Sequence, residues 1–398
     1  MTCFERRQFS PVEDCSGAGL YLHVPFCSSI CPYCDFAVLK GDRERRKHFV
    51  ETLIDEIGLY EGFGERFDTI YFGGGTPSLL SGEELERILG TLRRYLDVHD
   101  DPWVSLEANP EDVNVDSLAS WRRLGVKTLT LGVQSFDDTE LSFLGRAHDA
   151  KTARRAVEEA LAAGFHTVSL DLIYGLPDQS TSMWRRQLDT AIQLAPDHLS
   201  CYQLTVHEKT VFGVRRRRGE LVELADEPQA ELFFETHARL AETGYEGYEV
   251  SNFARRPVNR SRHNRKYWDH TPCLGLGPSA HSFDGRARWW NERKERSWSR
   301  RVGDGDRPVA GREELSSLEL AWEHLMLGLR TAEGVDLDEI RQRYGVDLWQ
   351  GNGDVIEKQV EASRLELEGR RLVPTLAGMA VADSLALAFE VPGQVSDR

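Results

Sequence analysis

The chain has 398 residues, and 40% of them are hydrophobic, which is ordinary for a globular protein of two or three domains. Its 65 acidic residues outnumber its 49 Lys and Arg, and the formal net charge of −16 argues against a nucleic-acid-binding protein or attraction to anionic lipid. No long apolar stretch is free of charges, and the first residues lack the apolar segment of a signal peptide. We therefore expect a cytoplasmic protein that is not integral to a membrane.

After a tail at residues 1–17, β-rich runs alternate with helical patterns as far as residue 206. The predicted strands cover 19–24, 67–72, 103–108, 126–133, 166–175 and 198–206. The predicted helices cover 43–63, 81–96, 114–124, 150–163 and 181–194. This alternation indicates an α/β fold with a parallel sheet, and six strands predict a partial (β/α)6 barrel over 18–206, since eight units close a full barrel. A doubly wound sheet is the alternative, and either fold gathers a site at the carboxyl ends of the strands.

The alternation fades over residues 207–310, a region rich in Arg and Trp that we interpret as an elaboration at the mouth of the barrel. Its basic run, Arg215–Arg218, is interpreted as a solvated loop. From residue 311 to 398, helical patterns over 313–335, 336–346 and 356–389, with a possible short strand in RRLVPT, predict a mostly helical, winged-helix-like domain. Without a basic surface this domain is interpreted as a packing or docking unit rather than a DNA reader.

Three of the seven cysteines, Cys27, Cys31 and Cys34, follow the first predicted strand with the spacing C-x3-C-x2-C. Three thiolates can hold an iron–sulfur cluster and leave one iron without a protein ligand, as a catalytic metal requires. The alternative is a zinc ion that also binds Cys3 together with His23 or Cys15, although the spacing is not a usual zinc spacing. An odd number of cysteines in a long chain does not indicate a disulfide framework, so the remaining cysteines, Cys3, Cys15, Cys201 and Cys273, are interpreted as ordinary thiols.

Other polar residues and glycines end the following predicted strands. GGGTP, residues 73–77, follows the second strand, and glycine lets backbone approach a ligand closely because it lacks Cβ. Glu107 ends the third strand, Gln134 the fourth and Asp171 the fifth. The two carboxylates could accept hydrogen bonds from ribose hydroxyls or an amine, and Arg146 could pair with a carboxylate. Together they describe a pocket for an amino acid joined to a ribose.

C-x3-C-x2-C after the first strand of a partial barrel resembles the radical S-adenosylmethionine superfamily. The segments YLHVPFC, YFGGGTPSLL, GVQSF, DLIYGLP and YQL are similar to the branch that contains oxygen-independent coproporphyrinogen III dehydrogenase and the haem chaperone HemW. The resemblance runs from about residue 18 into the C-terminal domain. It implies that Cys27, Cys31 and Cys34 hold a [4Fe–4S] cluster whose fourth iron binds S-adenosylmethionine. It further implies contacts to that cofactor from Tyr21, Gly74, Gly75, Thr76, Glu107, Gln134, Arg146 and Asp171.

Three features resemble the haem chaperones more than the dehydrogenase. The dehydrogenase has a further cysteine two residues after its third cluster ligand, where this sequence has Phe36, and it has a longer segment before the motif than the 26 residues that precede Cys27. The third feature is H-N-x-x-Y-W in RHNRKYWDH, which resembles a haem-binding signature and comprises His263, Asn264, Tyr267 and Trp268.

The side chains of this signature suit haem. His263 is the expected axial ligand through a neutral imidazole, and Tyr267 would lie one helical turn later on the same face. Trp268, Trp289 and Trp290 could supply apolar surface. His281 is a weaker candidate for the iron ligand, and the plain structural reading is that His263 caps a helix while the aromatic rings pack a domain seam.

The resemblance implies a haem chaperone that passes haem to apo-haemoproteins such as respiratory membrane enzymes. It would hold the cluster and S-adenosylmethionine, and a reductant protein would be a further partner. The alternative is a coproporphyrinogen III dehydrogenase that removes two propionate carboxyl groups by radical oxidative decarboxylation. A third alternative is another radical enzyme with a different substrate.

Overall fold

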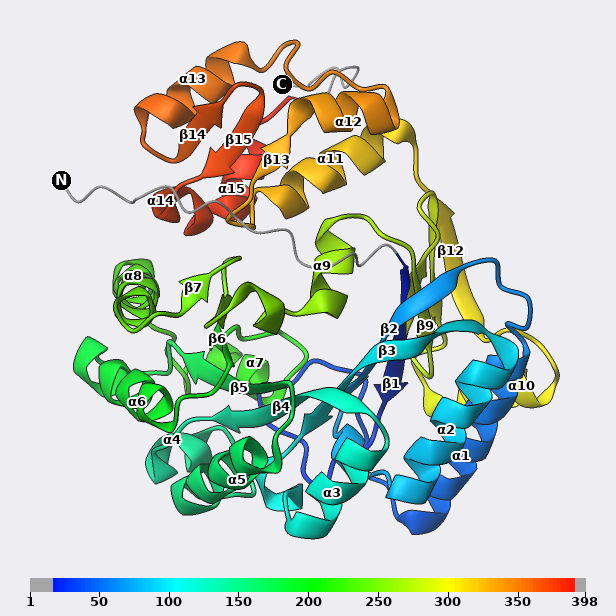
Figure 1. Ribbon diagram of the computed structural model, residues 1–398. Coiled ribbons are helices and arrows are strands. Elements are labelled where there is room, and N and C mark those ends of the chain that lie inside the picture. The colour runs from blue at the N-terminus through cyan, green and yellow to red at the C-terminus, as the bar shows by residue number, and fades with distance from the viewer. Residues whose placement is uncertain (1–16, 391–398) are drawn as a thin grey trace.

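The computed structural model describes residues 17–390, and its first half is the predicted α/β barrel fragment. Six parallel strands pair in the order of the sequence, β1 to β6, and curl into an open barrel with helices outside (Figure 1). Because the strand order never reverses, the sheet is not doubly wound. The strands are β1 (Ala18–Val24), β2 (Arg66–Gly74), β3 (Asp97–Ala108), β4 (Val126–Gln134), β5 (Thr167–Tyr174) and β6 (His198–Gln203).

The helices of the barrel fragment cover the outer face of the sheet. They are α1 (Arg43–Gly58), α2 (Gly82–Tyr95), α3 (Val115–Arg123), α4 (Asp138–Phe143), α5 (Ala150–Ala163) and α6 (Thr181–Leu194), with short 3-10 turns at Pro77–Leu79 and Pro110–Asp112. A capping box is present at the start of α2, where Ser81 and Glu84 satisfy each other's backbone N–H groups. Strand β3 begins earlier than expected, because the charged residues from Asp97 continue the pairing with β2.

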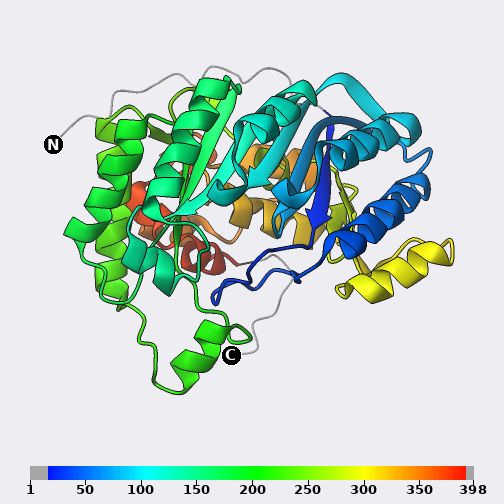
Figure 2. The same cartoon turned by 90° about the horizontal axis from the view of Figure 1, so that it is seen from below.

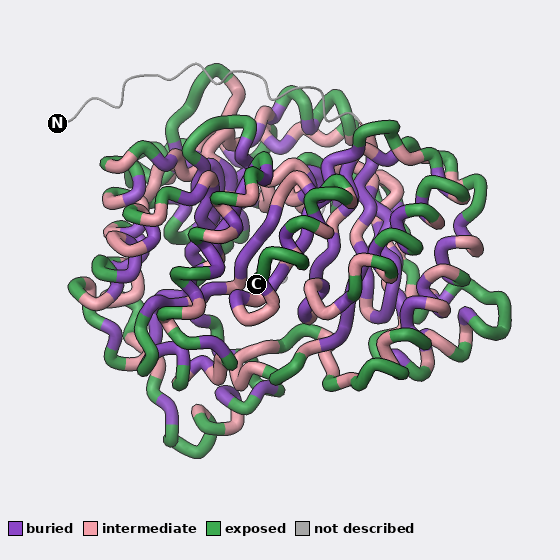
Figure 3. Tube along the Cα trace, turned by 60° about the horizontal axis from the view of Figure 1, so that its bottom comes forward, coloured by how far each residue is buried: buried purple, intermediate pink, exposed green. Residues whose placement is uncertain are grey.

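The two faces of the curled sheet differ sharply in polarity. Side chains that point outward, such as Leu20, Ile70 and Leu129, are buried against the helices in one large apolar core. The inward positions of the sheet carry polar side chains instead, such as Ser105 of β3 and Ser169 of β5. Figure 3 shows buried strands enclosed by helices with exposed outer faces. The usual barrel interior of branched apolar residues is therefore replaced by a polar one.

The region 207–310 extends the sheet at both edges, to twelve strands. Next to β6 lie β8 (Asn252–Ala254) and β7 (Glu246–Gly247), and next to β1 lie β9 (Cys273–Leu276), β10 (His281–Phe283), β11 (Ala287–Asn291) and β12 (Val309–Glu314). The helices of this region are α7 (Val211–Arg217), α8 (Asp226–Glu242), α9 (Arg262–Trp268) and α10 (Glu295–Gly303), with a 3-10 turn at Pro257–Asn259. The predicted loop at Arg215–Arg218 is wrong in part: its arginines end α7, and most of them are exposed as expected.

A buried carboxylate joins this extension to the barrel. Glu56 of α1 accepts hydrogen bonds from Gly277 N–H at 2.7 Å, Asn291 Nδ2 at 2.7 Å and Trp298 Nε1 at 3.0 Å. Burial raises the pKa of Glu56 to about 7, against the opposing effect of these three donors. The rings of Phe49 and Trp298 also meet, with centroids 5.4 Å apart, so α10 is held firmly against α1.

The C-terminal region has a separate apolar core that includes Leu325, Leu337, Leu348 and Leu372. Its elements are α11 (Ser317–Gly328), β13 (Val335–Asp336), α12 (Leu337–Tyr344), α13 (Gly353–Glu361), β14 (Leu365–Glu368), β15 (Arg371–Pro374), α14 (Leu376–Met379) and α15 (Ala382–Leu387). Three helices followed by a β-hairpin confirm the winged-helix-like arrangement. Within residues 17–390, no helix is long and apolar enough to cross a membrane.

Two parts of the C-terminal prediction are wrong. The expected helix from residue 313 begins only at Ser317, because residues up to Glu314 form β12, where Glu313 pairs with Arg288 of β11 at 2.8 Å. Residues 365–368, expected to be helical, form β14, and Gly369 adopts φ 65° in the turn of the hairpin. The expected division at residue 310 falls inside β12, and the domain boundaries stay a prediction.

Candidate functional site

The three cysteines lie on a loop that leaves the end of β1 and returns to it. Cys27 N–H donates to Leu39 O at 3.0 Å and Leu39 N–H donates to Pro25 O at 2.8 Å, so the loop is closed at its base. Each of the three thiols is partly buried and free of disulfide bonds. The segment between the two ends therefore projects as one unit from the carboxyl end of the first strand.

The three cysteine side chains were expected to hold an iron–sulfur cluster or, as the alternative, to contribute to a zinc site. Among the described residues, no group of three His, Cys, Asp or Glu side chains converges on one metal position. In a cluster each thiolate binds a different iron, so the sulfur atoms need not meet. Burial raises the pKa of the Cys27 thiol to about 11, so a bound cation would be needed to hold it as a thiolate. Of the alternative zinc ligands, Cys3 and Cys15 lie outside the described residues, and His23 has both ring nitrogens in contact with Tyr21 OH and Ala37 O.

The glycine turn after β2 packs directly on the base of the cysteine loop. Gly75 N–H donates to Val24 O and Thr76 N–H donates to Phe26 O, both at 2.7 Å. Gly74 has φ 109°, and a Cβ there would lie 2.7 Å from the His23 ring, while a Cβ on Gly75 would lie 2.6 Å from Phe26 O. Larger residues would force the turn away from β1, so these glycines set the shape of the rim.

Glu107 lies at the carboxyl end of β3 and ties this rim to β2. It accepts a hydrogen bond from Tyr71 OH at 2.7 Å and another from Gly74 N–H at 3.3 Å. Burial raises its pKa despite these two donors. Tyr21 stacks on Tyr71 with ring centroids 6.1 Å apart, so the predicted residues of β1, β2 and β3 form one continuous surface.

Arg146 lies at the rim, whereas Asp171, predicted to end the fifth strand, lies inside β5 and lines the barrel interior with Glu107. Both side chains retain unused hydrogen-bonding capacity. Arg146 donates to Asn109 Oδ1 at 2.6 Å and to Gly132 O at 2.9 Å, and it reaches Cys31 Sγ at 3.5 Å, while its buried Nε has no partner. Asp171 Oδ1 is also buried without a partner. Burial, followed by the charge of Glu107, raises the pKa of Asp171 to about 7. Gln134 ends β4 in the left-handed region at φ 66°.

The inside of the barrel holds a polar cavity of about 50 Å³ that the sequence patterns did not predict. Its lining includes Glu107, Asp171, Thr130, Ser169, Ser200 and Asn264. This space is large enough for a few water molecules. The signal was available in the strands LTL, VSL and LSC, where a small hydroxyl residue alternates with apolar ones.

The histidine of the H-N-x-x-Y-W segment is closed off in this structure. The segment is helical as expected, and His263 is 2% exposed. Its Nδ1 lies 2.9 Å from Thr69 Oγ1 and its Nε2 lies 3.0 Å from Tyr267 OH. Burial lowers its pKa to about 3, so the ring is neutral. Neither nitrogen is open to a haem iron in this arrangement.

The other predicted haem residues are dispersed. Asn264 lines the barrel cavity, and Trp268 packs near Tyr248 with ring centroids 5.9 Å apart. Trp289 contacts Phe63, and Trp290 stacks on the exposed His281, with centroids 6.0 Å apart in the second pair. Among the described residues, neither Trp289 nor Trp290 stacks on His263.

Comparison with known proteins places these features in a known lineage. A sequence profile of the radical SAM superfamily matches residues 21–191, and a profile of the HemN C-terminal domain matches residues 315–381. The chain is 37% identical over 372 residues to the haem chaperone HemW of Mycobacterium tuberculosis H37Rv, covering 92% of this chain and 93% of the relative. It is 36% identical over 401 residues to the mitochondrial radical S-adenosyl methionine domain-containing protein 1 of Bos taurus, covering 96% and 89%. Its fold matches Escherichia coli coproporphyrinogen III oxidase (HemN) with a TM-score of 0.81 at 21% identity, covering 94% of this chain and 91% of that one.

Proposed function

Since the chain belongs to the HemW-containing branch of the radical S-adenosylmethionine superfamily, we propose that it is a haem chaperone that binds haem and transfers it to apo-haemoproteins. The observation that carries the proposal is 37% identity to a haem chaperone along 92% of the chain. Phe36, which is exposed, supports the proposal, because the dehydrogenase is expected to have a further cysteine at this position. The recipients in this proposal include respiratory membrane enzymes, and the location is the cytoplasm.

We further propose that the rim holds a [4Fe–4S] cluster on Cys27, Cys31 and Cys34, with S-adenosylmethionine beside it. When bound, this pair can supply one-electron radical chemistry. The fit rests on the polar groups that are buried without a partner, Asp171 Oδ1 and Arg146 Nε, and on the glycine turn that a Cβ would block. Asp171 and Glu107 would accept hydrogen bonds, Arg146 would face an acidic group, and Tyr21, Thr76 and Gln134 would complete the contacts.

Haem binding by the H-N-x-x-Y-W residues requires a different arrangement of α9. His263 would have to exchange its hydrogen bond with Tyr267 for the iron, because the Tyr267 hydroxyl occupies Nε2. We propose that His263 makes this exchange, while Asn264, Tyr267 and Trp268 line the haem. Competition between an internal hydrogen bond and the iron would make haem binding reversible, as a transfer protein needs.

The test is haem retention by the anaerobically purified, cluster-reconstituted protein. A Soret band that survives gel filtration is expected for the wild type and should weaken in His263→Ala. Tyr267→Phe removes the competing hydroxyl, so this variant should hold haem at least as tightly as the wild type. Equal retention by the wild type and His263→Ala would contradict the assignment of the ligand, and no retention by the wild type would contradict the chaperone function.

The alternative activity is tested on the same preparation. The protein is incubated with coproporphyrinogen III, S-adenosylmethionine and dithionite, and the products are separated by chromatography. We expect no decarboxylation. Formation of protoporphyrinogen would overturn the chaperone proposal in favour of the dehydrogenase.

A further inference from the structure

One face of this acidic protein is strongly basic. Residues 40–48 and 292–301 together contain ten Lys or Arg and only four Asp or Glu, although the whole chain has a net charge of −16. The first segment enters α1 and the second forms the start and middle of α10, and these two helices pack together through Phe49 and Trp298. Two segments that are distant in sequence thus build one cationic surface.

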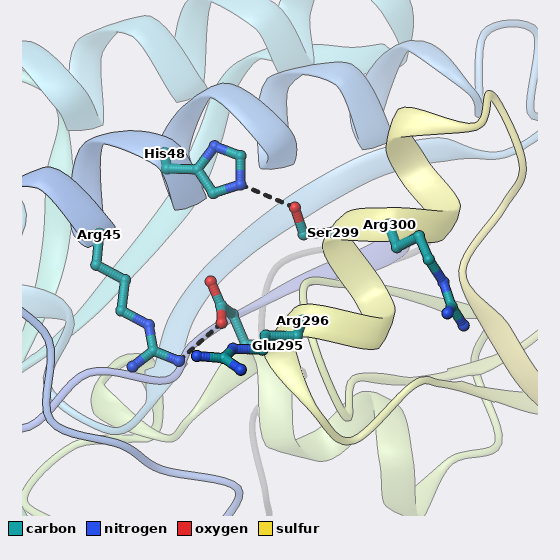
Figure 4. A pocket seen from close by; sticks show the side chains of 6 residues that line it. All are labelled: Arg45, His48, Glu295, Arg296, Ser299 and Arg300. Atoms are coloured by element: carbon teal, nitrogen blue, oxygen red, sulfur yellow. Dashed lines mark hydrogen bonds and ion pairs between the residues drawn. The ribbon is translucent and has the colours of Figure 1, made fainter.

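A shallow groove of about 470 Å³ runs between the two helices (Figure 4). Its lining is Arg45, His48, Glu295, Arg296, Ser299 and Arg300. The carboxylate of Glu295 is buried and paired with Arg45 at 2.9 Å, while Arg296 and Arg300 are exposed on α10. The groove therefore presents positive charge to a partner.

This surface adjoins the cysteine loop. Arg293 donates a hydrogen bond to Asp35 O at 2.9 Å, one residue beyond Cys34. On another side of the loop, Phe212 N–H of α7 donates to Pro32 O at 3.0 Å. The last turn of α7 carries the exposed Arg215 and Arg217, and the exposed Arg218 follows it directly. Figure 2 shows α7, the loop and α1 with α10 along the same side of the molecule. Positive charge therefore flanks the predicted cluster ligands on both sides.

Exposed apolar side chains occupy the space between these flanks. Phe36 and Ile30 of the loop are 68% and 44% exposed, and Val211 at the start of α7 is 55% exposed. Large apolar groups surrounded by charged ones are the usual composition of a transient protein interface. We call this surface the cysteine-loop face: Ile30, Phe36 and Val211 with the flanking arginines of α7 and α10.

We propose that the cysteine-loop face docks an acidic one-electron carrier protein. The inference rests on the proposed function for the presence of the cluster. In the transfer, the carrier is oxidised by one electron and the cluster is reduced by one electron, and no atom or bond is exchanged. Positive charge on both sides of the loop would steer an acidic carrier towards the cysteines, and the apolar centre would hold its cofactor close to them.

Complex formation is measured first, by titration calorimetry of the reconstituted protein with an acidic plant-type [2Fe–2S] ferredoxin at several salt concentrations. The wild type should bind, and binding should weaken as ionic strength rises. Charge reversal of the groove in R296E/R300E should weaken binding at low salt about tenfold or more. The matched control is R341E/R364E, which changes the net charge equally on exposed positions of the C-terminal domain and should bind as the wild type does.

Cluster reduction is then followed by absorbance with two reductants. Reduced ferredoxin should reduce R296E/R300E more slowly than the wild type, while dithionite, which needs no docking surface, should reduce both equally. Equal ferredoxin affinity and reduction rate in the two double variants would overturn the inference. So would loss of binding to anionic phospholipid vesicles in R296E/R300E with unchanged ferredoxin binding, because the face would then be a membrane surface. Absence of a reducible cluster in the wild type would instead contradict the proposed function.

Discussion

Two groups of buried polar residues in the barrel differ in how far their hydrogen bonds are satisfied. Asp171 Oδ1 in the barrel interior and Arg146 Nε at the rim are buried without a partner. His263, by contrast, has a partner on each ring nitrogen, Thr69 and Tyr267. Asp171 and Arg146 keep capacity for a ligand in this conformation, whereas the histidine must first lose an internal bond. The comparison indicates that cofactor binding needs little rearrangement and haem binding needs more.

The largest effect is expected at the cluster ligands. Cys31→Ala removes one of three proposed iron ligands, so the visible iron–sulfur absorption and the iron content after anaerobic reconstitution should be lost. Cys201→Ala is the matched control, because that thiol is buried in the strand β6 and should leave the cluster intact. A variant of Cys31 that keeps full iron and sulfide content would remove the reason for treating the rim as a cofactor site.

His263→Ala removes the buried histidine whose ring nitrogens both have partners. This change leaves Thr69 without its partner and opens a cavity, so the free energy of unfolding should fall by about 2–4 kcal/mol. Denaturant titration of the cluster-free protein measures it. His281→Ala is the control, since His281 is exposed and its removal should change the free energy of unfolding by less than about 0.5 kcal/mol. Comparable stability of the two variants would mean that the histidine network is not formed in solution.

The pH dependence of stability tests the raised pKa of Glu56, a buried carboxyl group that accepts three hydrogen bonds. Its pKa is raised from 4.5 to about 7 by burial, so the folded state binds a proton more tightly than the unfolded state. Stability from this group is therefore fully present below about pH 4.5 and is lost as the pH rises through 7. The unfolding free energy should fall across that window by about 2–3 kcal/mol from Glu56. In Glu56→Gln the fall should be smaller but still present, because the pKa of Asp171 is raised in the same direction. An unchanged pH profile in Glu56→Gln would show that this carboxyl titrates normally.

The sequence predicted the barrel fragment and its rim because both depend on local patterns. The six strands and their order follow from alternation, and parallel strands bring Glu107 and Gln134 to one edge whatever the details of packing. Asp171 was expected at the same edge but lies inside β5 and lines the barrel cavity. Strand β12 was missed because its charged residues look helical, and only the pairing with β11 makes them extended. Strand β11 itself lies outside the part of the sequence where strands and helices alternate, so the pairing could not be foreseen.

The closed state of His263 could not be predicted from the sequence. Its hydrogen bond to Thr69 joins residues 194 positions apart, and it depends on α9 lying across β1 and β2. That packing also needs Gly19, where a Cβ would lie 3.0 Å from the His263 ring. The motif predicts which residues act together, but it carries no information about which of their atoms already have hydrogen-bond partners.

Asp171→Asn tests whether the unpaired oxygen of Asp171 is kept for a ligand, and its expected effect is the smallest. The carboxylate is buried with one oxygen unpaired, so the neutral amide should leave the free energy of unfolding at pH 7.5 unchanged or slightly higher. The affinity of the reconstituted protein for S-adenosylmethionine should nevertheless fall about tenfold, or about 1.4 kcal/mol, because an acceptor becomes a donor. Calorimetry measures the affinity, and Asp189→Asn, on the outer helix α6, is the control that should bind normally. If Asp171→Asn destabilised the protein and left the affinity unchanged, the unpaired oxygen would be a structural defect and not a place kept for a ligand.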